Sequence, residues 1–282
     1  MKKRRIIVIC CIVAVLIILI GTMSALFNLK HVSVEILKNP SVLEAYGANF
    51  AEDVEKSADF NYGSNMLFTT YKHNQENIEK EFPFVKVEKM VRRFPNKMTI
   101  YVSGRIPEVI VTDSESANKW YVLDIEMKVV DVLSSESEIG TDLYRNLPIV
   151  TGAGMENLQE GDFVLGGENT KCLIGVLDGI YGKDQAPSSV MSDITIDLSG
   201  KNIQITLRDR SNERGAKILI SGFGDIKEKV YAAYYLYDTT FDTDDLNYLI
   251  KSELEFRVGA DFVPGTNERV VVYYEGSPYT EE

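Results

Sequence analysis

Residues 81–102, with the sequence EFPFVKVEKMVRRFPNKMTIYV, contain the clearest indication of the fold. Pro83 ends a helix, because proline lacks the N–H group that an interior helical position donates. Two segments rich in β-favouring residues follow, at 85–93 and 97–103, and the turn residues 94–96 separate them. The stretch therefore predicts the end of a helix followed by a two-stranded hairpin.

The residues before this stretch predict the rest of a small domain. Val32, Val34 and Ile36 occupy every second position, which is typical of a half-buried strand. Residues 50–58 and 72–81 carry apolar side chains at helical spacing. The predicted order of elements is β-α-α-β-β, a helix pair on a small sheet.

The first 27 residues predict a membrane anchor. Residues 2–5 (KKRR) form a basic block, and residues 6–27 contain no charged side chain. As a helix, a run of this length measures about 33 Å, enough to cross a hydrocarbon core of about 30 Å. Lysine and arginine beside a span stay on the cytoplasmic side. We therefore expect a cytoplasmic tail and an extracytoplasmic bulk. A cleaved signal peptide is the alternative, but the apolar run is too long for one.

Charge and cysteine content restrict the functions of the remaining chain. The net charge is −12 and all 42 acidic residues lie beyond residue 27, which disfavours bulk binding of nucleic acid. Cys172 is the only cysteine beyond that point, so no internal disulfide is expected. One local cluster is basic, and it either faces lipid headgroups or is a solvated strand face. Its members are Lys86, Lys89, Arg92, Arg93 and Lys97.

A second domain of mostly strands is predicted beyond a boundary at residues 107–117. Residues 194–198 and 203–207 alternate on either side of a turn, the pattern of a hairpin. Two helices are expected, at 168–181 and 225–237. The last strands are expected at 253–258 and 269–274.

Catalysis is not expected. His31 and His73 are the only histidines, and neither has a cysteine or histidine at metal-ligand spacing. The chain lacks a G-x-S-x-G motif and a P-loop lysine. Asp242, Asp244 and Asp245 lack the glycine and terminal glutamate of a calcium loop. We predict no cofactor, no metal and no small-molecule substrate.

The pattern of residues 81–107 resembles the end of the POTRA domain in the FtsQ/DivIB family of bacterial cell-division proteins. Its matching positions are Pro83, Val85, Val91, Arg93, Phe94, Pro95, Arg105 and Pro107. Gly104 stands where the family has a glutamate. Gly63–Met66 matches the element before the second helix, and residues 121–124 with 147–152 resemble the start of the family's β-domain. Residues 39–61 and 208–215 depart from the family.

The combined expectation is an α+β protein in five parts. Residues 1–5 form a cytoplasmic tail and residues 6–27 a transmembrane helix. Residues 28–107 form a β-α-α-β-β POTRA domain. Residues 117–275 form a mostly antiparallel β-domain with two or more helices, and residues 276–282 a short tail.

The resemblance also implies a function. It implies a non-catalytic divisome scaffold in the cell membrane that binds FtsL and DivIC/FtsB at the division septum and supports septal wall synthesis. Other division proteins would contact the POTRA domain. The alternative is a membrane-anchored extracytoplasmic protein that binds or modifies the cell wall and carries a POTRA domain.

The last strand is the candidate binding site. Residues 269–274 are a β-favouring run near the end of the chain, and the strand is either central and buried or at a sheet edge. In the family, the partner adds a strand beside this one. The residues carried over are Arg257, Val258, Val270, Val271, Val272, Tyr273 and Tyr274.

Overall fold

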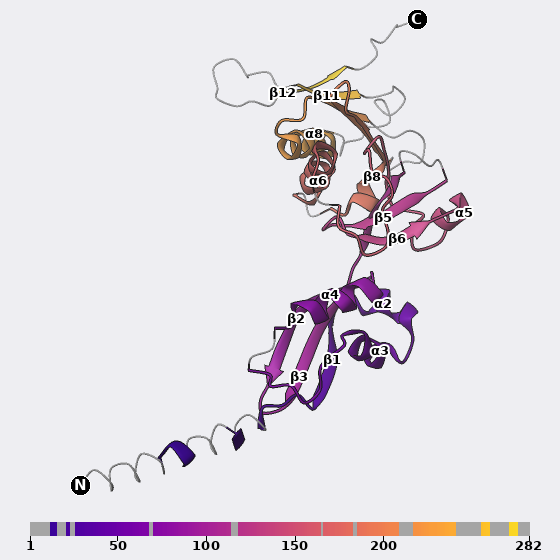
Figure 1. Ribbon diagram of the computed structural model, residues 1–282. Helices are drawn as coiled ribbons and strands as arrows, with labels where there is room; N and C mark the ends of the chain where they lie inside the picture. The colour runs from indigo at the N-terminus through magenta and orange to yellow at the C-terminus, as the bar shows by residue number, and fades with distance from the viewer. Residues whose placement is uncertain are drawn as a thin grey trace, which may run out of the picture. The chain divides into compact units, whose positions relative to one another are not determined.

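The computed structural model divides the chain into two compact units, Met1–Ile106 and Pro107–Glu282 (Figure 1). Each unit is described here by itself. The structure describes residues 12–15, 21–22, 26–67, 70–113, 118–164, 166–182, 185–208, 217–240, 255–259 and 271–275.

The expected transmembrane helix is wrong for this structure. Of residues 6–27, the described ones are 12–15, 21–22 and 26–27. A spanning helix needs about 20 consecutive apolar residues. No helix within the described ranges is long and apolar enough to cross a membrane. The rest of that run and both predicted tails, 1–5 and 276–282, lie outside the described residues.

The first unit has the predicted β-α-α-β-β order with one addition. Its elements are β1 (His31–Lys38), α2 (Pro40–Leu43), η1 (Glu44–Tyr46), α3 (Phe50–Ser57), α4 (Lys72–Glu81), β2 (Val85–Arg93) and β3 (Lys97–Gly104). The addition is the helical pair α2 and η1, which begins where Asn39-Pro40 ends β1. Proline is common at the first position of a helix, because the backbone N–H group at that position makes no hydrogen bond within the helix. Pro40 therefore begins α2 at the point where β1 has ended.

The sheet of the first unit has the order β1-β3-β2, with β1 parallel and β2 antiparallel to the central strand β3. Alternate residues of a strand point to opposite faces. Val85, Val87 and Ile100 therefore share one face, and they form a buried core with Val54 of α3 and Ile78 of α4. The other face carries no helix among the described residues.

The second unit contains a nine-stranded sheet and four helices within the described residues. Its strands are β4 (Pro107–Thr112), β5 (Trp120–Asp124), β6 (Val129–Leu133), β7 (Ile149–Thr151), β8 (Met191–Asp197), β9 (Asn202–Leu207), β10 (Lys217–Ser221), β11 (Glu255–Gly259) and β12 (Val271–Glu275). Its helices are α5 (Glu136–Ile139), α6 (Glu168–Tyr181), α7 (Pro187–Val190) and α8 (Ile226–Thr240).

The order of this sheet is β12-β11-β10-β9-β8-β7-β4-β5-β6. Three neighbouring pairs are parallel, β4 with β7, β7 with β8 and β10 with β11, and the other five are antiparallel. The sheet is thus mostly antiparallel, and the short strand β7 connects β8 with β4 through two parallel pairings.

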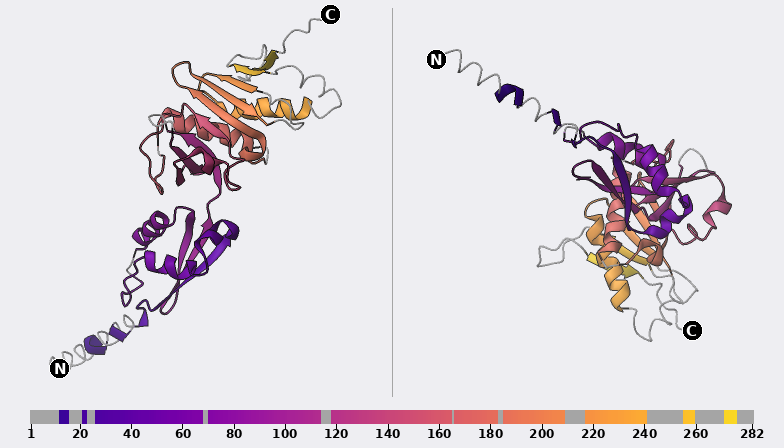
Figure 2. Two further views of the ribbon diagram at one scale, coloured as in Figure 1. Left: turned by 90° about the vertical axis from the view of Figure 1, so that its right-hand side faces the viewer. Right: turned by 90° about the horizontal axis from the view of Figure 1, so that it is seen from below.

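Helices α6 and α8 lie side by side over one face of this sheet (Figures 1 and 2). They approach closely because α6 has glycine at 175 and 179. A Cβ atom at Gly179 would lie 2.7 Å from Cβ of Val230 and 2.9 Å from the carbonyl oxygen of Lys227. Beneath them, Ile194, Ile205 and other inward-facing residues of the strands form the core.

Glu108, near the start of β4, is a buried carboxyl group. Burial raises its pKa, the nearby Asp124 raises it further, and a hydrogen bond from the hydroxyl of Tyr181 acts in the opposite direction. The raised pKa means that the carboxyl group of Glu108 binds its proton more tightly in the folded state than in the unfolded chain. The protonated group therefore contributes its full stabilisation at pH values below its ordinary pKa. It is lost as pH rises through the folded pKa.

Glu108→Gln is therefore expected to raise the melting temperature at pH 7 and leave it unchanged below pH 4.5, the ordinary pKa of this group. The amide keeps the shape and removes the buried charge. The measurement is the difference in melting temperature between parent and variant across this pH range. Glu136→Gln, on the exposed surface, is the matched control and should show no such trend. If the difference in melting temperature between parent and Glu108→Gln did not change with pH, the raised pKa of Glu108 would be contradicted.

Candidate partner-binding site

Strand β12 lies at one end of the nine-stranded sheet, and among the described strands it pairs with β11 alone. In this antiparallel register, Val272 stands opposite Val258, and Tyr273 stands opposite Arg257. The structure therefore brings together six of the seven residues predicted for partner binding. Val270 lies outside the described residues.

The opposite end of the sheet, at β6, is covered by the chain itself. The amide of Val129 donates to the carbonyl of Asp162 at 2.8 Å, and the amide of Gly161 donates back to the carbonyl of Val129 at 2.8 Å. An isolated bridge between Lys128 and Phe163 continues this pairing. The segment around residues 161–164 thus acts as a short extra strand along the start of β6.

The two ends of the sheet differ in whether another described segment pairs with the outermost strand. Within the described part of the chain, no segment pairs with the outer side of β12. An uncovered edge presents a row of backbone donors and acceptors, which a strand from another chain can use. β12 is therefore the candidate site for strand addition.

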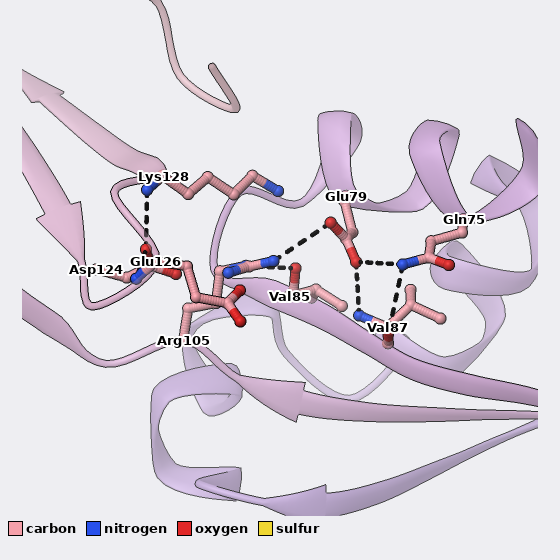
Figure 3. Close-up of polar contacts among 8 residues, drawn as sticks. All are labelled: Gln75, Glu79, Val85, Val87, Arg105, Asp124, Glu126 and Lys128. Carbon is pink, nitrogen blue, oxygen red and sulfur yellow. Dashed lines mark hydrogen bonds and ion pairs between the residues drawn. The ribbon is translucent and has the colours of Figure 1, made fainter. Parts of the chain in front are cut away.

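The β2 edge of the first unit is closed by side chains (Figure 3). The carboxylate of Glu79 on α4 accepts a hydrogen bond from the amide of Val87 at 2.9 Å, and Gln75 donates to the carbonyl of Val87 at 3.3 Å. Arg105 donates from Nε to the carbonyl of Val85 at 3.2 Å. These side chains occupy the positions that an added strand would need at this part of β2.

Arg105 and Glu79 also form the most buried ion pair among the described residues. The guanidinium Nη2 lies 3.3 Å from Oε2 of Glu79, and the two side chains are 3 % and 12 % exposed. The backbone amide of Arg105 donates to the carbonyl of Phe84 at 2.7 Å. The pair therefore fastens α4 to β2 and to the residue that follows β3.

Gly104 has a structural reason to be glycine. A Cβ atom there would lie 2.5 Å from the backbone oxygen of Asn39 and 3.0 Å from Cβ of Val42. The side chain of Asn39 also donates to the carbonyl of Gly104 at 2.9 Å. The start of α2 thus occupies the space that the glutamate of the FtsQ/DivIB motif would need.

Gly104→Ala is expected to destabilise the first unit by about 1–3 kcal/mol, the usual range for overpacking. Hydrogen exchange of the amides in β2 and β3 measures the loss in the full chain. The control is Ser103→Ala, because the buried hydroxyl of Ser103 has no hydrogen-bond partner within the described residues. That variant should be neutral or slightly stabilising, so equal losses in both variants would disprove the steric explanation.

Four of the five residues of the predicted basic cluster lie on one face of the β2–β3 hairpin, and Arg92 lies on the other. Arg93 donates from Nη2 to the hydroxyl of Tyr101 at 2.7 Å, and Nζ of Lys89 lies 4.8 Å from the centre of the same ring. Lys97 stands opposite Arg93 in the β2–β3 register, and Lys86 stands opposite Ser103. Arg92 points to the other face, where its guanidinium lies 5.1 Å from the centre of the Tyr71 ring.

Comparison with known families decides what the first unit is. Residues 50–105 match the family model described as "POTRA domain, FtsQ-type". The chain carries an FtsQ-type POTRA domain. This match confirms the resemblance to the FtsQ/DivIB family that the sequence showed. The matched residues include α3, α4, β2 and β3. A search of curated proteins gives no match to the chain.

The POTRA domain supports a division-related protein that acts outside the cytoplasm. FtsQ-type POTRA proteins are scaffolds that work through protein–protein interaction, and they are not enzymes. Among the described residues, the outer side of β12 is a sheet edge at which a partner strand could pair.

Proposed function

We propose that this protein is a non-catalytic divisome scaffold that binds FtsL and a DivIC/FtsB-type partner at the division septum and supports septal wall synthesis there. The observation that carries the proposal is the difference between the two ends of the large sheet. Residues 161–164 of the chain pair with the start of β6, and no described segment pairs with the outer side of β12.

In this proposal the partner adds a strand to β12, and DivIC/FtsB is the partner that does so in the related family. Five residues of β12 provide few outward backbone groups, because neighbouring residues of an antiparallel strand point their N–H groups to opposite edges. Each net hydrogen bond contributes about 0.5–1.5 kcal/mol. Because association itself costs about 4–15 kcal/mol, the backbone ladder alone gives only weak binding. The ladder sets the register and direction of the partner strand, and side-chain contacts with the partners supply the remaining binding free energy.

The test is co-purification of the tagged full-length protein with FtsL and DivIC from its own cells, together with the position of a fluorescent fusion. The expected result is a complex of the three proteins and a ring at midcell. A uniform peripheral signal, no capture of either partner and hydrolysis of purified cell wall would instead support a wall-modifying protein.

A further inference from the structure

We infer that the tip of the β2–β3 hairpin is a membrane-contact site that rests on an anionic lipid surface. The tip consists of residues 93–97, the turn and its two flanking cations. It belongs to the POTRA domain, so this inference is independent of partner binding at β12.

The chain enters the POTRA domain directly beside this tip. The amides of Lys30 and His31 donate to the carbonyl of Asn96 at 2.9 Å and 3.3 Å. The rings of Phe27 and Phe94 meet edge to face with their centres 5.3 Å apart. The hairpin tip and the entering chain thus form one end of the domain.

Exposed apolar side chains gather at this end. Phe94 is 57 % exposed, Leu26 is 55 % exposed and Leu67 is 43 % exposed. Leu67 is held nearby because the amide of Met66 donates to the carbonyl of Phe27 at 2.9 Å. These side chains come from three separate segments, so their gathering results from the fold. Exposed apolar groups that cluster in this way mark interaction sites.

The turn that carries Phe94 has a cationic residue at each end. Arg93 and Lys97 flank the turn and stand opposite each other in the β2–β3 register. Like charges in directly opposed positions destabilise a hairpin. Within the described residues, Lys89, Arg93 and Lys97 form no ion pair with a carboxylate. Their charge is therefore available to an external anion, in a chain whose net charge is −12.

The combination of an exposed aromatic ring with flanking cations selects a lipid surface. The headgroup phosphates of anionic lipids attract Lys and Arg, and the acyl boundary accepts the ring. A hydrated anionic polymer would pair with the cations and leave Phe94 in water. The geometry therefore favours an anionic bilayer over a polymer or a nucleic acid.

The test places a tryptophan at the tip. Trp120 is the only tryptophan, so the parent for the test is the full chain with Trp120→Phe. Phe94→Trp is added to this parent, and the protein is reconstituted in vesicles whose acyl chains carry bromine as a quencher. Quenching is expected to be roughly twofold or more stronger with phosphatidylglycerol than with phosphatidylcholine. It should fall when salt is raised or when Arg93→Glu and Lys97→Glu are introduced.

The matched control is Ile36→Trp in the same parent. Ile36 is 44 % exposed on β1 of the same domain, about 17 Å along the strand from His31, which pairs with Lys97 beside the tip. Its tryptophan should show little quenching. Equal quenching at positions 36 and 94, none at 94, or no dependence on lipid charge would overturn the inference. If a soluble anionic wall polymer, in place of vesicles, changes the emission of the Phe94→Trp variant, the inference is overturned in favour of a polymer site. Circular dichroism verifies that each variant is folded.

Discussion

Proline at position 272 or 273 is expected to weaken binding of the DivIC-type partner at least about tenfold, and one of the two changes should do so without unfolding β12. Neighbouring residues of an antiparallel strand direct their N–H groups to opposite edges. One of these two donors therefore bonds to β11, and the other faces the open edge. Proline at the outward position removes a donor that pairs with no described segment of the chain and that the proposed partner would use.

The measurement compares Val272→Pro and Tyr273→Pro in a co-purification titration with the partner and in hydrogen exchange of the β11 amides. One variant should lose both partner binding and β11 protection, and the other should lose partner binding alone. Val272→Thr and Tyr273→Phe keep the backbone donor and are the controls that should bind normally. Full partner binding by both proline variants would exclude strand addition at β12.

Glu79→Ala is expected to destabilise the POTRA domain by about 3 kcal/mol. The change leaves the guanidinium of Arg105 buried without its carboxylate, and breaking a buried pair from one side costs about 3–5 kcal/mol. It also removes the acceptor for the amide of Val87 at the β2 edge. Hydrogen exchange of the β2 amides in the full chain measures the effect.

Glu81→Ala is the matched control, because Glu81 is an exposed glutamate on the same helix. It should change stability by less than about 0.5 kcal/mol. Replacing both partners, with Glu79→Leu and Arg105→Met, should recover part of the loss, because no charge then remains buried alone. Equal effects of Glu79→Ala and Glu81→Ala would show that the ion pair contributes little.

Local patterns in the sequence were sufficient to predict where many of the individual helices and strands lie. Helix α4, strand β2 and helix α6 begin and end at the predicted residues, because apolar periodicity and neighbouring prolines or glycines act within a few residues. The same local reasoning predicted a transmembrane helix at 6–27, and no helix that could span a membrane occurs in the described part of the chain.

Glu79 and Gln75 show what sequence reasoning missed. Each is a polar residue on a predicted helix, where a glutamate or glutamine usually faces water. Their part in closing the β2 edge depends on the distance between α4 and Val87, which no local pattern records. Gly104 is similar. Its departure from the family motif is visible in the sequence, but the reason is the backbone of Asn39, 65 residues earlier.

The sequence by itself determined the β-α-α-β-β order of the first domain apart from α2 and η1, the hairpins and the resemblance of that domain, since each of these depends on residues close together in the chain. The tertiary structure alone decided which strand lies at an edge. β7 lies between β4 and β8, residues 161–164 cover β6, and β12 ends the sheet. Backbone hydrogen bonds between strands are nearly the same for every residue type, so strand order follows from packing across the whole sheet.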